Sequence, residues 1–373
     1  MKKKREIQYN DKRNGIIQRL KDVLSGTGQR ILVPVGSSRT GLATKASDID
    51  LVLITSSDPI KRIDIIKSFV DASFRRFPFF LNILMNCRSV EMYLQSTLKV
   101  LQSSSLKREF DWKKALVLHN ASVPILHLET NSGFRIDIQF DQECSIRNTL
   151  FLRYCVKEDL RVEMLNLWAQ SFLKLMGLKN SRIGLFSSYH IAMIVIYFLQ
   201  HIGIGQKNPI LPLVYDVYND HLNNLIPIEN IIAEIDNIQR YERPALQKIG
   251  VYPEFPELLI SFIDYFSSID LNSISLSVKT DGKLPDTLIL ILPSLYGFAQ
   301  QSFFYRSDCD EFRNILWIND PYSIETICRV TNGADLLMNA FKSIKQQFIV
   351  GRGLSWPIKV KNLHESCISR DNK

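Results

Sequence analysis

The sequence lacks the features that mark membrane-spanning, disulfide-rich and low-complexity proteins. Its 373 residues contain no uninterrupted apolar run of about 20 residues, the length that a transmembrane helix needs. The six cysteines form no C-x-x-C pair and have no histidine at metal spacing, so neither a disulfide framework nor a zinc site is expected. There is no low-complexity tract and no solenoid repeat. The chain is therefore expected to be globular, and its length favours two domains.

Charge alone excludes little. Lys and Arg number 46 against 38 Asp and Glu, which gives a net charge of +8. A polyanionic partner is compatible with this balance, but so are many other functions. The basic run over residues 1–5 has no apolar segment behind it and is not a secretory signal. A nuclear address and a phosphate-contacting arm are both open, although a solvated end is favoured. Residues 1–9 and 354–373 are expected to be flexible ends.

The hydrophobic periodicity changes near residue 145. Before it, apolar runs with period two alternate with helical patterns, and after it helical periods dominate. Strands are predicted over 31–35, 49–55, 116–118, 123–128, 134–140 and 315–318, and helices over 10–25, 59–70, 160–176, 187–199, 284–304 and 335–348. The predicted class is α+β. A small α/β domain with a mixed sheet spans 26–145, and a mostly helical domain over 146–350 carries the helix of residues 10–25 packed on it.

Three aspartates lie on predicted strands. Asp48 and Asp50 are two residues apart, so both carboxylates point to the same face of a strand. Asp137, between two isoleucines, has the pattern of a polar residue on an otherwise buried strand. Adjacent carboxylates repel each other unless a cation lies between them. A neighbouring strand that brought Asp137 beside the pair would complete a set of three hard oxygen ligands, which suits Mg²⁺ or Mn²⁺.

Such a cluster has a recognised chemistry. Two metal ions about 4 Å apart stabilise both the attacking and the leaving oxygen of an in-line displacement at phosphorus. Gly36 and Ser37 follow the first predicted strand, where a glycine allows backbone N–H groups to approach a phosphate closely and Ser37 adds a hydroxyl. Taken singly, an Asp-x-Asp pair is most often a surface feature, and a Gly-Ser pair is usually a turn. Their order along the chain is far more specific.

The stretch from Val35-Gly36-Ser37 through Ser47-Asp48-Ile49-Asp50-Leu51 resembles the signature of the DNA polymerase β-like nucleotidyltransferase superfamily. More narrowly, it is similar to the poly(A) polymerases and terminal uridylyltransferases of the germline-development-defective-2 and caffeine-induced-death-1 type. The resemblance covers about residues 14–200 and 285–345. It implies a nucleotidyltransferase catalytic domain and a helical domain with the poly(A)-polymerase-associated motif.

Further motifs carry the resemblance into the helical region. Asn148-Thr149 matches the segment whose side chains sit at the ribose of the NTP. Phe186-Ser187-Ser188-Tyr189 resembles Leu-Ser-Ser-Tyr, in which the Ser contacts a phosphate and the Tyr stacks on the base. Asn319-Asp320-Pro321-Tyr322 resembles the C-terminal nucleotide-recognition motif. The resemblance thus implies that Asn148, Thr149, Ser188 and Tyr189 bind nucleotide. Without it, Tyr189 reads as ordinary core and Asn148 as a cap or turn residue.

The sequence also departs from this family. The two lysines expected at the triphosphate are placed at Gln170 and Lys174, so one positive charge is missing. The basic residue expected after Pro124-Ile125-Leu126 is His127. No His lies within residues 323–329, directly after the C-terminal motif, although uridylyl-specific members carry one there. Glu325 and Thr326 are the expected contacts near the base.

The function that the resemblance implies is template-independent addition of nucleotides to RNA 3′ ends, with adenylate or mixed-base addition slightly favoured. The alternatives are a terminal uridylyltransferase, an inactive member that serves as a scaffold, and a transferase with a non-RNA acceptor. The expected partners are an RNA 3′ end, an NTP and an RNA-binding or adaptor protein, with no membrane. A cytoplasmic location is expected, with RNA granules and the nucleus as further options.

Overall fold

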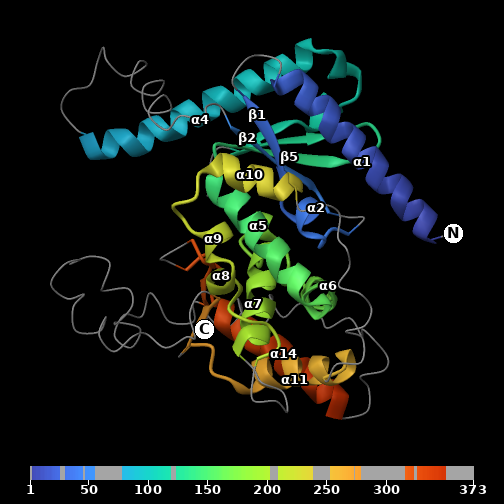
Figure 1. Ribbon diagram of the computed structural model, residues 1–373, viewed down its shortest axis with the longest axis vertical. Helices are drawn as coiled ribbons and strands as arrows, with labels where there is room; N and C mark the ends of the chain where they lie inside the picture. The colour runs from blue at the N-terminus through green and yellow to red at the C-terminus, as the bar shows by residue number, and fades with distance from the viewer. Residues whose placement is uncertain are drawn as a thin grey trace, which may run out of the picture. The chain divides into compact units, whose positions relative to one another are not determined.

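The computed structural model describes residues 2–25, 30–44, 47–54, 78–118, 123–201, 209–237, 253–272, 274–278, 316–322 and 326–349. The chain divides into two compact units, each treated by itself below. The first unit comprises Met1–Arg153 and Leu225–Gln239, and the second comprises Tyr154–Asn224 and Arg240–Lys373. A mixed sheet dominates the first unit and helices dominate the second, which confirms the predicted α+β class (Figure 1).

The sheet of the first unit has five strands in the order β1-β2-β5-β4-β3. They are β1 (Ile31–Val35), β2 (Ile49–Ile54), β3 (Leu116–Leu118), β4 (Ile125–Glu129) and β5 (Arg135–Phe140). The central pair β2 and β5 is parallel, and the other neighbours are antiparallel. Every strand lies within about two residues of its predicted position. The turn between β4 and β5 forms at Gly133, whose φ of 85° suits a residue without a Cβ.

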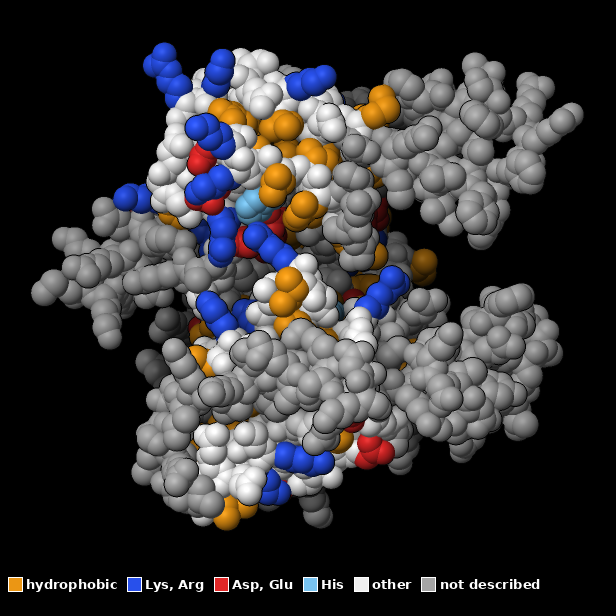
Figure 2. Space-filling view, turned by 180° about the vertical axis from the view of Figure 1, so that it is seen from behind, with side chains coloured by type: hydrophobic (Ala, Val, Ile, Leu, Met, Phe, Trp, Pro, Cys, Tyr) orange, Lys and Arg blue, Asp and Glu red, His pale blue; other side chains and the backbone are white. Residues whose placement is uncertain are grey.

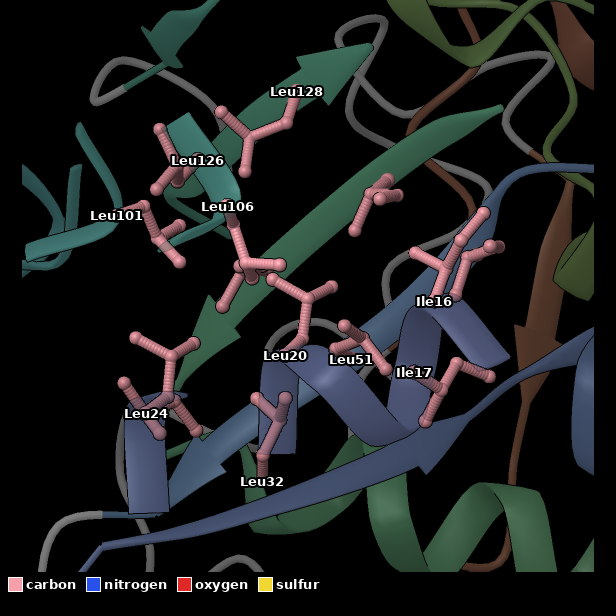
Figure 3. Packing of buried hydrophobic residues seen from close by; sticks show 14 of the residues in the cluster. Ile16, Ile17, Leu20, Leu24, Leu32, Leu51, Leu101, Leu106, Leu126 and Leu128 are labelled. Atoms are coloured by element: carbon pink, nitrogen blue, oxygen red, sulfur yellow. The ribbon is translucent and has the colours of Figure 1, made fainter. Parts of the chain in front are cut away.

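Two helices cover one face of this sheet, α1 (Lys2–Ser25) and α4 (Pro78–Ser103). Ile16, Ile17, Leu20 and Leu24 recur at helical spacing on α1 and pack into the core beneath the strands (Figure 3). The prediction that this helix packs on the helical domain is therefore wrong, because its apolar stripe fits the sheet. The helix also begins at Lys2, within the end that was expected to be flexible.

The other face of the sheet carries shorter elements of the same unit. The helix α2 (Ser37–Thr40) packs on β1 and β2. The helix α5 (Glu143–Glu158) begins directly after β5, and Arg153 on it donates to the carbonyl of Ile235 on α10 (Ile228–Asn237). Two short 3₁₀ turns, η1 (Ser105–Arg108) and η2 (Trp112–Lys114), link α4 to β3.

Helices form the second unit around an aromatic core. Its long helices are α6 (Leu160–Leu175), α7 (Ser188–His201), α11 (Phe255–Ser268) and α14 (Gly333–Ile349). Shorter elements are α8 (Val214–Val217), α9 (Asn219–Leu222), η3 (Ser181–Ile183) and a parallel pair of strands, β6 (Ser275–Ser277) and β7 (Trp317–Asn319). Rings of Phe172, Phe262, Phe266 and Phe341 contact one another between α6, α11 and α14.

Helix starts in this unit follow their capping residues. The Asp159 side chain accepts from the Arg161 N–H at the start of α6, and the Ser187 hydroxyl accepts from the His190 N–H at the start of α7. The second bond confirms the predicted serine cap. The helices predicted over 59–70 and 284–304 lie wholly or almost wholly outside the described residues, as does the tail after residue 353. In the described part, no helix combines the length and the apolar character that a bilayer crossing requires.

Candidate active site

The catalytic candidates lie in one row across the sheet of the first unit. The strand register pairs Asp50 with Val35 on β1 and with Asp137 on β5, and it pairs Asp137 with His127 on β4. Residues opposite each other on neighbouring strands point to the same face. This face is opposite to the one that α1 and α4 cover. The sequence prediction that a neighbouring strand brings Asp137 beside Asp50 is therefore confirmed.

The carboxylates in this row repel one another. Burial, followed by the nearby charges of Asp137 and Asp48, raises the pKa of Asp50 from 3.8 to about 7, while the Arg13 guanidinium opposes the rise. A second negative charge on the row is therefore costly unless a cation compensates it. This is the electrostatic condition that favours cation binding among carboxylates.

An arginine and a histidine of the chain itself contact the two outer carboxylates. Arg135 Nε lies 2.6 Å from Asp48 Oδ1, and His127 Nδ1 lies 2.5 Å from Asp137 Oδ1. Arg13, 4% exposed on α1, donates to the backbone carbonyl of Asp48 at 2.6 Å. Sequence reasoning missed Arg13 and Arg135. The signal for Arg13 was present, because it lies four residues before Ile17 on the apolar stripe of α1, where a cation needs a buried partner.

These ion pairs bear on the expected metal site. Among the described residues, no three His, Cys, Asp or Glu side chains are gathered as a ready metal cage. Asp48 and Asp137 are instead directed to Arg135 and His127. The donor set still fits a hard divalent cation, since burial and the nearby charges of Asp137 and Asp48 raise the pKa of Asp50. A cation would bind by replacing Arg135 and His127 as partners of the outer carboxylates.

Gly36 brings the backbone against the carboxylate row. Its φ of 64° lies in the region that favours glycine, and a Cβ at this position would lie 2.6 Å from Asp50 Oδ2. Any other residue would therefore push into the central carboxylate. The Gly36 N–H donates to Thr149 Oγ1 at 2.9 Å, and Ser37 begins α2 directly beside the row. The close backbone approach expected at Gly36 is present. The group that the backbone approaches is the Asp50 carboxylate.

Thr149 connects α5 to the glycine loop. Its buried hydroxyl donates to the carbonyl of Ser145 at 2.7 Å and accepts from the Gly36 N–H, so its only donor is used. The place of Thr149 at the ribose stays a prediction, as does that of Asn148, which is half-buried on the same turn of α5.

Two motifs that lie far apart in the sequence meet in the second unit. The Tyr189 hydroxyl at the start of α7 donates to Asp320 Oδ2 at 3.1 Å, across 131 residues, and the Tyr322 N–H donates to Asp320 Oδ1 at 2.9 Å. Burial, followed by the charge of Asp320, raises the pKa of Tyr189 well above its ordinary value. The hydroxyl is thus fixed while the ring remains half-buried. This arrangement fits a flat platform for a base.

The comparisons with known proteins agree with this arrangement of motifs. The family model of the mitochondrial-like poly(A) RNA polymerase central palm domain matches residues 2–157. A Drosophila melanogaster poly(A) RNA polymerase, gld-2 homolog A, is 26% identical over 254 residues, which cover 67% of this chain and 16% of the relative. The chain is thus similar to poly(A) RNA polymerases of the GLD-2 type, and the matched family model covers its residues 2–157. Human poly(A) RNA polymerase GLD2 is 24% identical and is covered to 55%, against 86% of this chain.

Solved structures of the GLD-2/Cid1 family have the same fold. A GLD-2/RNP-8 complex aligns with a TM-score of 0.52 and 21% identity over 75% of this chain and 81% of that one. A Cid1 poly(U) polymerase bound to MgATP aligns with a TM-score of 0.58 and 18% identity over 94% and 91%. The chain spans only about 16% to 55% of the length of the curated relatives named above.

The departures from the GLD-2/Cid1 pattern have structural counterparts in the second unit. Gln170 lacks the expected charge, but Lys179 Nζ donates to its amide oxygen at 2.7 Å. A cation therefore occupies the place beside Gln170, supplied from nine residues further along the chain. Lys174, one turn after Gln170 on α6, is exposed, and Ser188 is exposed at the start of α7.

The Thr326 hydroxyl bonds backbone groups, and its contact with a base stays a prediction. Its hydroxyl accepts from the N–H groups of Ile318 and Cys328, at 3.0 and 3.2 Å, and donates to the carbonyl of Leu316 at 3.2 Å. A hydroxyl used in this way holds the loop after the Asp320 motif to β7 and has no donor left for a base. Glu325 lies outside the described residues. The same loop is fixed to α7, because His190 Nε2 lies 3.0 Å from the Ile327 carbonyl oxygen.

Proposed function

We propose that this chain transfers nucleoside monophosphates from NTPs to RNA 3′ ends without a template. The observation that carries the proposal is the register that places Asp50 beside Asp137 and directly against Gly36. Carboxylates beside a glycine loop suit phosphoryl transfer. The loop allows a phosphate to approach closely, and a cation between the phosphate and the carboxylates would offset their mutual repulsion. The names of the relatives, poly(A) RNA polymerases and a poly(U) polymerase, support an RNA acceptor.

The proposed reaction is an in-line displacement at the α-phosphorus of the NTP. The RNA 3′-oxygen forms a bond to this phosphorus, and the bond to the oxygen that bridges to the β-phosphorus breaks. Pyrophosphate leaves with the electron pair of that bond. The 3′-hydroxyl proton passes to a carboxylate of the row, and Asp137 is suited to accept it because His127 orients its side chain.

We propose that the row holds divalent cations during this reaction, Mg²⁺ or Mn²⁺. When bound, they would neutralise the charge that develops on the attacking and leaving oxygens. Asp48, Asp50 and Asp137 are the ligands proposed for them. The neighbouring side chains Arg135 and His127 compensate the outer carboxylates when no cation is bound, which prevents the row from carrying three uncompensated charges.

For the nucleotide, we assign roles residue by residue. Gly36 and Ser37 contact the triphosphate through backbone and hydroxyl groups, and Asn148 contacts the ribose. Tyr189 stacks on the base, since its ring is half-buried and its hydroxyl is fixed by Asp320. Ser188 is exposed at the start of α7, and Lys174 is exposed near the end of α6. Both side chains contact phosphate oxygens.

Base choice and partners belong to the same proposal. No histidine lies within residues 323–329, directly after the Asp320 motif, so a site that selects uracil through such a side chain is not expected, and adenylate or mixed addition is favoured. GLD-2 has been solved in complexes with RNP-8 and GLD-3, which supports an adaptor protein that chooses the RNA. A cytoplasmic location, with RNA granules included, is proposed on the same family grounds.

The deciding experiment is a tailing assay on the purified chain. A 5′-labelled single-stranded RNA is incubated with each NTP in turn, and with an equal mixture of the four, in Mg²⁺ and in Mn²⁺. We expect extension that uses ATP at least as well as UTP, and no extension by Asp50→Asn. Absence of extension under every condition would overturn the proposed function. Strict use of UTP would leave the transferase intact and overturn only the base preference.

A further inference from the structure

The face of the sheet that carries the carboxylates is covered unevenly. On the β1–β2 side, Val33, Val35 and Val52 point to this face and are buried, and α2 packs over both strands. Gln139 on β5 is also engaged, because its side-chain oxygen accepts from the Ser145 hydroxyl at the start of α5. The cover thus ends near the middle of the sheet.

On the β4–β3 side of the same face, two leucines of β3 are exposed among the described residues, although His127 on β4 is buried. Leu116 and Leu118 on β3 are 52% and 37% exposed, and the register pairs them with His127 and Ile125 on β4. The residues between them, Val117 and Leu126, pack into the core on the opposite face. Figure 2 shows apolar side chains gathered next to a histidine and acidic groups in its upper half, with Lys and Arg side chains around them.

Apolar exposure of this kind is unusual next to a charged site. The row runs Asp50, Asp137, His127, Leu116, one strand at a time, so Leu116 lies two strands from Asp137. With strands about 4.8 Å apart, that is roughly 10 Å, close to the span of one or two nucleotides. An apolar floor therefore begins about 10 Å from the acid that we assign to the attacking hydroxyl, with His127 between them.

The direction of the reaction identifies the occupant of this floor. Gly36 and Ser37 place the triphosphate on the β1 side of the row. An in-line displacement needs the attacking oxygen on the side opposite to the leaving pyrophosphate, which is the β4–β3 side. Lys113, exposed one residue before the end of η2, precedes β3 and supplies positive charge next to the floor.

We propose that the RNA acceptor binds on this surface, with its terminal bases packed on Leu116, Leu118 and Ile125 and its backbone near Lys113. The terminal 3′-hydroxyl then passes over His127 to Asp137. This inference rests on the proposed function and extends it by naming the acceptor surface. Aliphatic side chains offer a flat apolar contact to any base, so this surface holds single-stranded RNA without reading its sequence.

The test is steady-state tailing, with KM measured separately for RNA and for NTP. The double variant L116S/L118S should raise the KM for RNA about 5-fold or more, because two apolar contacts are lost, and leave the KM for NTP within about twofold. Leu116→Trp should lower the KM for RNA by widening the platform. Met92→Ser, a 60% exposed residue of α4 on the other side of the sheet, is the matched control and should change neither value.

Salt dependence separates base packing from phosphate contact. L116S/L118S should weaken RNA binding without changing the slope of log affinity against log salt, whereas Lys113→Ala should make the slope shallower by about 0.7. An RNA with 4-thiouridine next to its 3′ end should crosslink to β3 or β4. If L116S/L118S does not fold, Leu116→Trp and the crosslink decide the question.

The outcomes distinguish the two levels of the proposal. A wild-type chain that extends no RNA with any NTP overturns the proposed function and this inference with it. A wild-type chain that extends RNA, while L116S/L118S and Leu116→Trp keep its KM for RNA, overturns the acceptor surface alone. Variants that alter the sedimentation mass and leave the KM for RNA unchanged also overturn it, since a second copy of the chain would then cover the floor.

Discussion

The carboxylate row of the first unit and the Tyr189–Asp320 motif of the second unit satisfy their polar groups in different ways. In the row, the Arg135 guanidinium pairs with Asp48, and a ring nitrogen of His127 contacts Asp137. In the motif, the Tyr189 hydroxyl and the Tyr322 N–H donate to Asp320. The side-chain partners of the row can be exchanged for a cation or a substrate, whereas the backbone bond that holds Asp320 cannot. The row is therefore suited to chemistry and the motif to holding a fixed shape.

The largest effect that this contrast predicts concerns Asp50 and Asp137. Replacement of either by Asn should lower the tailing rate on the order of 10³-fold or more, because the row acts as a unit. Single-turnover rates with saturating NTP check this expectation. The double variant should be no slower than the worse single variant. Losses that multiply would mean that the two aspartates act independently and would break the assignment of one shared cluster.

Asp50→Asn, which should lower the tailing rate, should by contrast raise the stability of the folded chain. The folded-state pKa is about 7, above the ordinary 3.8, so between these values the folded chain holds a proton that the unfolded chain has lost. Stability therefore falls as the pH rises through this window. Without divalent cations, Asp50→Asn should melt at a higher temperature than wild type at pH 8 and similarly at pH 4. A lower melting temperature at pH 8 would show that the ionised Asp50 carboxylate does not destabilise the folded chain.

Arg13 should have the next largest effect, because it binds the row from the buried side. Arg13→Leu leaves the Asp48 carbonyl without its donor and should cost about 1–3 kcal/mol in the free energy of unfolding, with a lower tailing rate. Arg19→Leu is the control on the same helix. Its ion pair with Glu109 is exposed and should be worth about 0–1 kcal/mol. Urea denaturation of both variants gives the comparison, and equal losses would contradict a special role for Arg13.

A substitution at Thr326 tests the hydrogen bonds that hold the loop next to the Tyr189–Asp320 motif. Thr326→Val keeps the shape and removes the hydroxyl that bonds Ile318, Cys328 and Leu316, so it should cost about 1–3 kcal/mol. Thr326→Ser keeps the hydroxyl and should cost less. Neither variant should change the ratio of ATP to UTP use. A changed ratio with unchanged stability would return Thr326 to base recognition.

The smallest effect is expected at Lys179, which lies beside Gln170. Lys179→Met should raise the KM for every NTP a few-fold, since one positive charge near a triphosphate is lost at a partly exposed position. Lys342→Met on α14, also an exposed lysine, is the control and should leave the KM unchanged. If Lys179→Met also leaves it unchanged, the cation beside Gln170 has only a structural role.

The limits of the sequence prediction follow from the range of the interactions involved. Period-two and helical patterns located the strands of the sheet and the helices α6, α7 and α14, because local burial decides them. The partner of α1 was predicted wrongly, since an apolar stripe does not specify which apolar surface it meets. The backbone bonds of the Thr149 and Thr326 hydroxyls could not be predicted either. A hydroxyl in a motif can bind a ligand or a backbone group, and only the fold determines which of these lies within reach.

By itself, the sequence determined the chemistry: an Asp-x-Asp pair on one strand face, a third aspartate on another strand, and a glycine that comes before them. These follow from the alternation of side chains along strands, which is a local property. Only the tertiary structure decided which positive side chains hold the carboxylates and which half of the sheet face stays open. Both depend on strand order, and strand order is set by pairings between segments up to about a hundred residues apart, which no local pattern records.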